Sequence, residues 1–272
     1  MRHDKVMIKT KNSEAELTLY LLDNFPAIDM DRVRPVILIC PGGGYHFVSE
    51  REAEPVAMQM LAMGFHAAVL RYHVAPTRFP NALAEAACSV AHLREHAAEY
   101  HLDPKKIVVA GFSAGGHLTA SLGVFWQEEW LKEYTNCEPE EVKPNGLILS
   151  YPVITSGEFA HRKSFVNLLG DDATQEQIEY VSLENRVTNL VPPTFIWHTV
   201  VDQTVPVENT MLFTMALKKA GVKFEQHIYP QGAHGLSLAN RETARYENPE
   251  RSIQPECAAW INMAGRFVKE EL

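Results

Sequence analysis

Short apolar runs alternate with longer amphipathic segments along the chain. The runs at residues 36–40, 107–110 and 146–150 are apolar at nearly every position, as in strands that are buried on both faces of a sheet. Residues 6–10 and 15–22 are rich in strand-forming residues and are separated by the turn sequence K-N-S. They predict an N-terminal antiparallel hairpin.

The amphipathic segments between these runs predict helices. Ser49 and Glu52 have the S-x-x-E spacing of a capping box, and Gly64 and Gly221 follow two of the predicted helices as terminating residues. Strand and helix thus alternate, which predicts right-handed crossovers and an α/β fold with a mostly parallel sheet of about eight strands, covered by helices on both faces. The remaining strands are predicted at residues 67–70, 194–198 and 222–229, and the helices at residues 49–63, 81–100, 115–130, 206–220 and from 255 onward.

No internal repeat, low-complexity tract or Pro/Ser-rich linker divides the sequence, so residues 1–272 are expected to form a single domain. Two segments, at about residues 123–145 and 152–192, interrupt the regular alternation. Loops at the carboxyl ends of strands vary while the sheet does not, which favours these segments as a lid or as pocket walls. Trp126 and Trp130 fit that role and the core equally well.

Composition and charge narrow the classes of partner. Of the 272 residues, 46% are hydrophobic and 22% are charged, which is ordinary for a globular protein with a sizeable core. The formal net charge is −9, from 25 Lys and Arg against 34 Asp and Glu, and no block of basic residues could neutralise a row of phosphates. Nucleic acid is therefore not an expected partner.

The amino terminus carries scattered charges instead of the apolar stretch of a signal peptide, and no later segment approaches the ~18 apolar residues of a membrane span. We therefore expect a cytoplasmic protein without a membrane partner. The four cysteines lie far apart with no C-x-x-C pair, so we expect free thiols and neither a zinc site nor a redox motif, with Cys40 and Cys88 buried.

A candidate nucleophile lies between a buried strand and a helix. Residues 111–115 read G-F-S-A-G, which matches the G-x-S-x-G pattern in the strand, turn and helix context that this pattern requires. The flanking glycines would let the backbone approach closely where a side chain would block it, and Ser113 at the apex would present its hydroxyl above the sheet. The sequence therefore predicts a nucleophilic serine at the positive end of the following helix.

A serine hydroxyl needs a base to take its proton, and the base needs an acid to orient it. Asp202 follows an apolar strand and precedes a helix begun by Pro206, while His234 lies between glycines on a loop after another strand. Open α/β sheets place their sites at the carboxyl ends of strands. Ser113, Asp202 and His234 are therefore predicted to form a catalytic triad.

Other residues stay open for the acid and the base. Asp171, Asp172 and Glu208 are alternative acids, although the aspartate pair lies in a long irregular stretch and Glu208 is already within a helix. If one of these three were the acid, Asp202 would only cap the helix that follows it. His198 belongs to a strand end and His117 to the helix after the serine, where packing or a satisfied hydrogen bond is the expected role.

Residues 41–45 read P-G-G-G-Y and directly follow a buried strand. A glycine-rich loop in that place can bind phosphate, but this one lacks the G-x-G-x-x-G spacing of a dinucleotide turn and the G-K-[ST] ending of a P-loop. We interpret the glycines instead as backbone N–H donors to a negative charge that exists only during a reaction.

A rival motif points to a metal. His92, Glu95 and His96 match H-x-x-E-H, the signature of inverted zinc peptidases. On a helix, both histidines lie opposite the apolar stripe that includes Leu83 and share a face with Glu85, which a sheet-covering helix would turn to water. The sequence therefore favours a solvated face with coincidental spacing, and no metal site is expected.

These motifs together resemble the α/β-hydrolase fold, and within it the small esterases related to the hormone-sensitive lipase group and the bacterial carbohydrate esterases of the acetyl-xylan and feruloyl type. The resemblance implies the triad already named, with the oxyanion held by the backbone N–H groups of Gly43, Gly44 and Ala114. Lipase-like relatives begin the glycine loop with histidine, where this chain has Pro41. That difference favours the carbohydrate-esterase side and leaves open what supports the loop. The resemblance extends over most of the chain, through residues 40–45, 71–76, 111–116, 202–206 and 232–235.

The resemblance implies a serine carboxylic ester hydrolase that acts through an acyl-enzyme intermediate, without a metal or organic cofactor. Its partner would be a small-molecule ester with a short acyl chain, with acetylated sugars or small oligosaccharides as candidates, and a homodimer stays open. Two alternatives also stay open. One is an amide hydrolase of the prolyl-oligopeptidase or formamidase type with the same triad. The other is a non-catalytic binding protein on a hydrolase scaffold, which the occupied triad positions disfavour.

Overall fold

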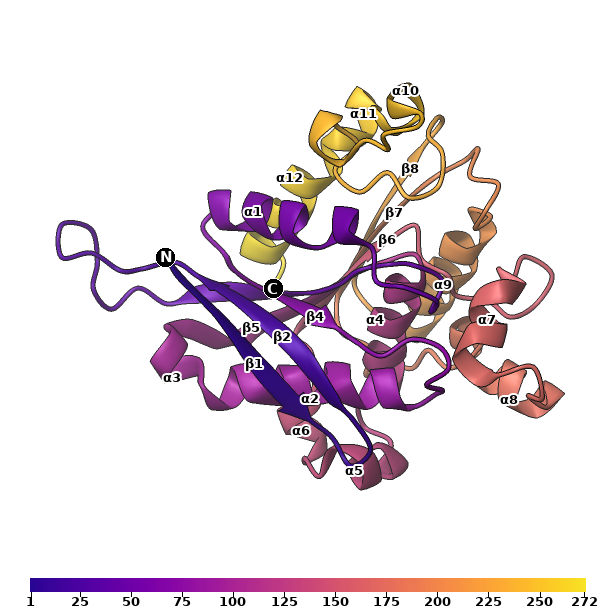
Figure 1. Cartoon of the computed structure of the whole chain (residues 1–272), viewed down its shortest axis with the longest axis horizontal. Helices are drawn as coiled ribbons and strands as arrows, with labels where there is room; N and C mark the ends of the chain where they lie inside the picture. Colours follow the sequence, from indigo (N-terminus) through magenta and orange to yellow (C-terminus); the bar gives the residue numbers. More distant parts are fainter.

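The computed structural model describes residues 1–272, and an eight-stranded sheet forms its centre. Its strands are β1 (Arg2–Lys9), β2 (Glu14–Leu21), β3 (Arg34–Cys40), β4 (His66–Arg71), β5 (Leu102–Phe112), β6 (Gly146–Ser150), β7 (Thr194–Thr199) and β8 (Phe224–Tyr229). Their order across the sheet is β1-β2-β4-β3-β5-β6-β7-β8 (Figure 1). β2 pairs antiparallel with β1 and with β4, and every other neighbouring pair is parallel. The predicted sheet and its N-terminal hairpin are confirmed.

Helices cover both faces of the sheet. They are α1 (Glu54–Ala62), α2 (Asn81–Glu95), α3 (Ala97–Tyr100), α4 (Ala114–Phe125), α5 (Glu129–Thr135), α6 (Pro139–Val142), α7 (Arg162–Leu169), α8 (Gln175–Tyr180), α9 (Glu208–Ala220), α10 (Pro249–Ser252), α11 (Pro255–Ala258) and α12 (Trp260–Glu270), with 3-10 turns η1 (Glu50–Glu52), η2 (Leu183–Asn185) and η3 (Arg241–Thr243). None of these helices has the length and apolar composition needed to cross a bilayer.

Alternate residues of each central strand point to opposite faces, so the sheet separates two cores. In β3, Ile37 and Ile39 pack with α1 and α12, whereas Val36 and Leu38 pack with α2, α4 and α9. Figure 1 shows α1 and α12 together on one side of the sheet and α2 on the other. The continuous apolar runs of the sequence follow directly from this burial on both faces.

Three of the predicted helices are divided, and the last of them, from residue 255 onward, forms α11 and α12. The segment at residues 81–100 forms α2 and α3, because the backbone of His96 leaves the helical region at φ −94° and ψ 15°. The segment at residues 115–130 forms α4, which ends at Phe125, and α5, which begins at Glu129.

The S-x-x-E sequence does not form the predicted capping box. Ser49 makes no side-chain hydrogen bond at the start of η1, and α1 begins only at Glu54. Glu52 is buried instead and accepts a hydrogen bond from the backbone N–H of Gly42. Glu52 bonds to Gly42 and not to its own helix start, because the buried N–H of Gly42 would cost free energy if it were left without an acceptor.

The predicted exposure of Glu85 to water is wrong. Its side chain is fully buried, and its carboxylate accepts hydrogen bonds from the Ser13 hydroxyl at 2.5 Å and from the backbone N–H of His73 at 2.8 Å. The hairpin turn and the loop after β4 therefore cover this part of α2. The periodicity of the helix could not indicate that second cover, because its residues lie elsewhere in the sequence.

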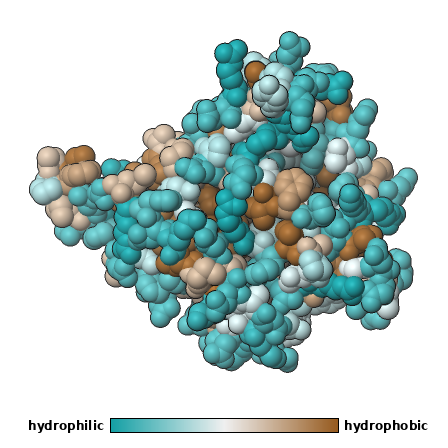
Figure 2. All heavy atoms as spheres, viewed as in Figure 1, coloured by the Kyte–Doolittle hydropathy of each residue, from teal (hydrophilic) through white to brown (hydrophobic).

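The segment between β2 and β3 projects from the body of the molecule, at the left of Figure 2. Asn24 closes this loop through hydrogen bonds from its side-chain amide to the carbonyls of Met30 and Arg32, each 2.9 Å long. The loop carries large exposed apolar side chains, which are Phe25, Ile28, Met30 and Val33.

Candidate active site

Ser113 lies at the apex of the turn between β5 and α4, with φ 53° and ψ −117°. A Cβ atom on Gly111 would lie 2.1 Å from the carbonyl oxygen of Gly115, and one on Gly115 would lie 2.1 Å from that of Cys40. Both flanking positions therefore require glycine, as the G-x-S-x-G pattern predicts. A non-glycine residue at positive φ is strained, and here the strain falls on the candidate nucleophile itself.

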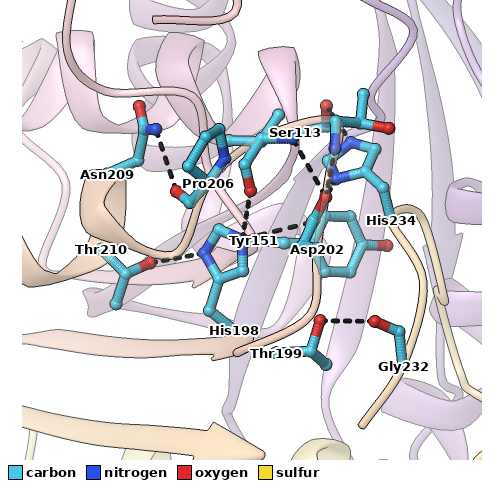
Figure 3. A network of polar contacts seen from close by, with 12 residues as sticks. Ser113, Tyr151, His198, Thr199, Asp202, Pro206, Asn209, Thr210, Gly232 and His234 are labelled. Carbon is cyan, nitrogen blue, oxygen red and sulfur yellow. Dashed lines mark hydrogen bonds and ion pairs between the residues drawn. The ribbon is translucent and has the colours of Figure 1, made fainter. Parts of the chain in front are cut away.

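The structure brings Ser113, His234 and Asp202 into one hydrogen-bonded line (Figure 3). Nε2 of His234 lies 2.8 Å from Oγ of Ser113, and Nδ1 of His234 lies 2.6 Å from Oδ2 of Asp202. The three residues follow the carboxyl ends of β5, β7 and β8. The geometry is that of a nucleophile, a base and an orienting acid.

The alternative acids lie outside this line. Asp172 is an exposed residue that pairs with Arg78 at 2.7 Å. Asp171 is also exposed, and Glu208 lies in the first turn of α9. None of the three hydrogen-bonds to His234, so the structure favours Asp202.

Asp202 is buried and accepts four hydrogen bonds. Oδ1 accepts from the backbone N–H groups of Thr204 at 2.9 Å and Val205 at 3.0 Å, and Oδ2 accepts from His234 and from His198. Burial alone would raise the pKa of this carboxyl, but the hydrogen bonds from the two histidines outweigh it and hold the pKa well below its ordinary value. Asp202 is therefore ionised at neutral pH and can stabilise an imidazolium.

His198 contacts Asp202, whereas the sequence predicted only packing or a satisfied hydrogen bond for it. Its Nε2 lies 3.2 Å from Oδ2 of Asp202 and 2.9 Å from the carbonyl oxygen of Val205, while Nδ1 lies 2.8 Å from the hydroxyl of Thr210. Both neighbours of Nε2 are acceptors, so Nε2 carries the proton and Nδ1 accepts from Thr210. His198 thus fixes the carboxylate from the side opposite His234.

The glycine loop presents free N–H groups beside Ser113. Gly43 and Gly44 have φ of 129° and 63° and line the same cavity as Ser113. The backbone N–H groups of Gly43, Gly44 and Ala114 donate to no protein acceptor, whereas that of Gly42 is taken by Glu52. The three groups that the resemblance implies are therefore available to a developing oxyanion.

Three side chains support the loop in which Pro41 replaces histidine. The hydroxyl of Tyr72 donates to the carbonyl of Pro41 at 2.6 Å, and the amide of Asn167 donates to the carbonyl of Gly44 at 2.7 Å. Glu52 accepts from the loop at 2.9 Å. The sequence assigned none of the three to this loop, because they come from separate segments and Glu52 was interpreted as part of a capping box.

Tyr151 is a further residue that the sequence did not indicate. Its hydroxyl donates to Oε1 of Glu52 at 2.7 Å and accepts from the backbone N–H of Ser237 at 2.8 Å. Its ring packs edge-on against the imidazole of His234, with the centroids 5.1 Å apart. Tyr151 and Glu52 therefore tie the glycine loop to the histidine loop beneath the candidate triad.

Ser113 opens into a cavity of about 230 Å³ in which Phe47 is the only apolar lining residue. The segment at 152–192 contributes His161, Lys163 and Asn167 to its walls, whereas the segment at 123–145 contributes none. The tryptophans of residues 123–145 pack internally. Trp126 hydrogen-bonds to the carbonyl of Leu190, and Trp130 hydrogen-bonds to the hydroxyl of Tyr180.

The histidines of the H-x-x-E-H sequence stack on each other. The ring centroids of His92 and His96 are 4.1 Å apart, and Nε2 of His92 lies 3.1 Å from the hydroxyl of Tyr100. Nδ1 of His96 donates to the carbonyl of His92. No group of three or more His, Cys, Asp or Glu side chains in the structure has an arrangement that could hold a metal ion.

Comparison with known sequences gives one family match and several longer relatives. The BD-FAE family profile matches residues 22–217. Endo-1,4-beta-xylanase B of Butyrivibrio fibrisolvens is 40% identical over 218 residues, which are 78% of this chain and 34% of that protein. The acetylxylan esterase of Xylanibacter ruminicola is 30% identical over 208 residues, which are 73% of this chain and 40% of that protein. The chain thus spans less than half the length of these curated relatives.

Solved structures match over nearly the whole chain. The acetyl ester-xyloside bifunctional hydrolase of Caldicellulosiruptor lactoaceticus has a TM-score of 0.81 and 36% identity, and the match covers 96% of this chain and 89% of that one. A carboxylesterase of Lactobacillus plantarum has a TM-score of 0.85 and 27% identity, with 100% and 98% covered. The predicted α/β-hydrolase fold and the resemblance to carbohydrate esterases are confirmed, and the chain belongs to the BD-FAE family.

Proposed function

We propose that the chain hydrolyses short-chain carboxylic esters, with Ser113 as nucleophile, His234 as base and Asp202 as the acid that orients the base. The observation that carries this proposal is the line of hydrogen bonds from Ser113 through His234 to Asp202, 2.8 Å and 2.6 Å long, at the wall of an open cavity. The similarity to proteins named as esterases supports the same reaction class.

Acylation begins when Nε2 of His234 takes the proton of the Ser113 hydroxyl and Oγ attacks the ester carbonyl. The carbonyl oxygen becomes an oxyanion, which the N–H groups of Gly43, Gly44 and Ala114 stabilise. Collapse of the tetrahedral intermediate breaks the bond to the alcohol, which leaves with the proton from His234. Asp202 stays ionised throughout and stabilises the imidazolium.

Deacylation repeats these steps with water. His234 takes a proton from a water molecule, which attacks the acyl-Ser113 carbonyl, and the same N–H groups stabilise the second oxyanion. The carboxylic acid is released, and Ser113 regains its proton from His234. The proton transfers between Ser113 and His234 use two groups that are within hydrogen-bond reach of each other.

The proposed substrates are acetylated sugars and small oligosaccharides. A cavity of about 230 Å³ with one apolar lining residue suits a small acyl group on a hydroxyl-rich alcohol better than a long acyl chain. One similar protein is named an acetylxylan esterase and another an acetyl ester-xyloside bifunctional hydrolase, which supports this class.

A panel of esters tests the proposal. We expect turnover of p-nitrophenyl acetate and of acetylated xylose, falling steeply from acetate to octanoate, and a Ser113→Ala variant that retains less than about 10⁻³ of the activity. Ser89→Ala is the matched control, because this buried hydroxyl bonds only to a carbonyl of its own helix. Turnover of p-nitroanilides but of no ester, or ester turnover that survives Ser113→Ala, would contradict the proposal.

Asp202→Asn tests the role of the acid separately. The neutral amide of asparagine is a weaker hydrogen-bond acceptor than the carboxylate that both histidines now contact at Oδ2. The tautomer of His234 is then no longer enforced. We expect kcat for p-nitrophenyl acetate to fall by about 10³- to 10⁴-fold, with a smaller change in KM. The double variant with Ser113→Ala should be no slower than Ser113→Ala alone, since residues that act as a unit are not additive.

A further inference from the structure

The cavity beside Ser113 carries an excess of cationic side chains in a chain whose net charge is −9. Arg51, Lys163 and Arg245 line it, and Glu52 is the only carboxylate among the lining residues. Both oxygens of Glu52 already accept hydrogen bonds, from the backbone of the glycine loop and from Tyr151. The single negative charge of Glu52 therefore cannot balance the three cations of the cavity.

Two of these cations converge beside the candidate base. A Cβ atom on Gly235 would lie 3.2 Å from Nη2 of Arg245 and 4.0 Å from Nη1 of Arg51. Gly235 directly follows His234 and has φ 77°, which a side chain rarely adopts. Both guanidinium groups therefore lie beside the backbone of Gly235, next to His234, and Oε1 of Glu52 lies 3.9 Å from the same Cβ position.

Neither guanidinium has a carboxylate partner. The only hydrogen bond of the Arg51 side chain runs from Nε to the carbonyl of Thr243, at 2.6 Å, and its Nη2 is buried without a partner. Arg245 makes no side-chain hydrogen bond, and no carboxylate oxygen lies within ion-pair distance of either residue. Burial lowers the pKa of Arg51, and the nearby cation of Arg245 lowers it further, whereas the charge of Glu52 acts in the opposite direction. Two close, unpaired cations of this kind form a site for an anion.

The chemistry of the proposed reaction decides which part of a substrate would reach this site. The alcohol oxygen must lie within hydrogen-bond distance of Nε2 of His234 to receive its proton, whereas the acyl oxygen faces the glycine loop. Groups attached to the alcohol therefore extend past His234, toward Gly235 and the two arginines.

We infer that the enzyme selects esters whose leaving alcohol carries a carboxylate, which Arg51 and Arg245 hold beside Gly235. Among sugars, the matching class is the acetylated sugar acids. Arg245, which is exposed, would meet the carboxylate first, and Arg51 would complete a site with two cations on one anion. The inference rests on the proposed esterase function and adds to it a preference for a leaving alcohol that carries a negative charge.

Matched acetate esters test the inference on the whole chain. The probes are 3- and 4-acetoxybenzoate, each paired with the neutral acetoxybenzamide of nearly the same shape, and phenyl acetate as an ester that lacks the group. We expect wild type to show a higher kcat/KM for each carboxylate than for its amide. Arg245→Gln and Arg51→Gln should each lower the carboxylate-to-amide ratio by about 10- to 100-fold, the usual worth of a charged hydrogen bond.

Three further variants separate charge at this site from other effects. Arg245→Lys should restore part of the ratio because it restores the cation. Lys218→Gln, which removes an exposed cation on α9 outside the cavity, should keep the wild-type ratio. Arg51→Gln also removes the bond to Thr243, so its melting temperature is measured, and Arg245→Gln carries the conclusion if Arg51→Gln is unfolded.

The outcomes distinguish the inference from the function on which it rests. Equal use of the carboxylate and amide esters by wild type, together with Ser113-dependent turnover of phenyl acetate, would overturn the anion site alone. A carboxylate preference that survives both arginine substitutions would overturn its assignment to Arg51 and Arg245. The absence of Ser113-dependent turnover for every ester would instead overturn the proposed function.

Discussion

At the scale of the residue, the hydroxyl of Tyr151 joins three parts of the chain that meet beneath the histidine loop. It bonds to Glu52, which in turn holds the glycine loop, and to the backbone of Ser237, while its ring supports His234. Desolvation and the neighbouring carboxylate of Glu52 both raise the pKa of Tyr151, so the phenol stays protonated and donates to Glu52. The position of the base thus depends on a residue that does no chemistry itself.

Tyr151→Phe tests this contact. The substitution keeps the ring but leaves Oε1 of Glu52 and the N–H of Ser237 buried without partners, which should lower the free energy of unfolding by about 1–3 kcal/mol. Urea unfolding measures the change. Tyr246→Phe, at a ring that is 99% exposed, should change it by less than about 0.5 kcal/mol. Similar values for the two variants would show that the buried hydroxyl is not structurally important.

At the scale of the element, the shape of the glycine loop after β3 depends on the positive φ angles of Gly43 and Gly44 and on contacts from other segments. A Cβ atom on Gly43 would lie 1.9 Å from the carbonyl oxygen of Phe47, so even a methyl group would displace the loop. The loop in turn positions two of the three N–H groups proposed for the oxyanion.

Gly43→Ala should therefore lower kcat/KM for p-nitrophenyl acetate by about 10²- to 10³-fold, the usual cost of losing an oxyanion donor. Gly221→Ala is the control, because Gly221 also has positive φ, at 73°, but no atom lies within 4 Å of a Cβ built on it. It should cost about 1 kcal/mol of stability and leave the rate unchanged. A Gly43→Ala enzyme with wild-type kinetics would rule out this loop as an oxyanion donor.

At the scale of the whole molecule, two buried histidines couple folding to pH. Burial lowers the pKa of His66 to about 4 and that of His117 to about 4, from an ordinary value of 6.5. His66 donates to the carbonyl of His101 and His117 to that of Val181, and these bonds raise the pKa but offset only part of the effect of burial. Between pH 6.5 and about pH 4 the unfolded chain therefore binds protons that the folded chain does not.

The free energy of unfolding should accordingly fall as the pH is lowered through that window, by up to about 1.4 kcal/mol per pH unit for each histidine. His117→Gln should reduce this slope, because glutamine does not titrate. Urea midpoints measured from pH 7 to pH 4 give the slopes. Equal slopes for wild type and His117→Gln would contradict the assignment.

Much of the architecture and of the candidate triad could be predicted from the sequence, because both depend on local patterns. Buried parallel strands need continuous apolar runs, and the turn at Ser113 needs glycines at fixed offsets. Asp202 and His234 could be predicted because each follows a strand of the same sheet, whose carboxyl ends must share an edge.

The tertiary structure alone decided the side chains that hold those residues in place. The sequence predicted that Glu52 caps a helix and that Glu85 faces water. Both are buried instead, because their partners come from segments distant in sequence. The same holds for Arg51 and Arg245, which are ordinary surface residues in the sequence and share one cavity only after folding. Periodicity and motif spacing encode contacts between near neighbours, whereas hydrogen bonds and charge pairs between distant segments exist only once the chain has packed.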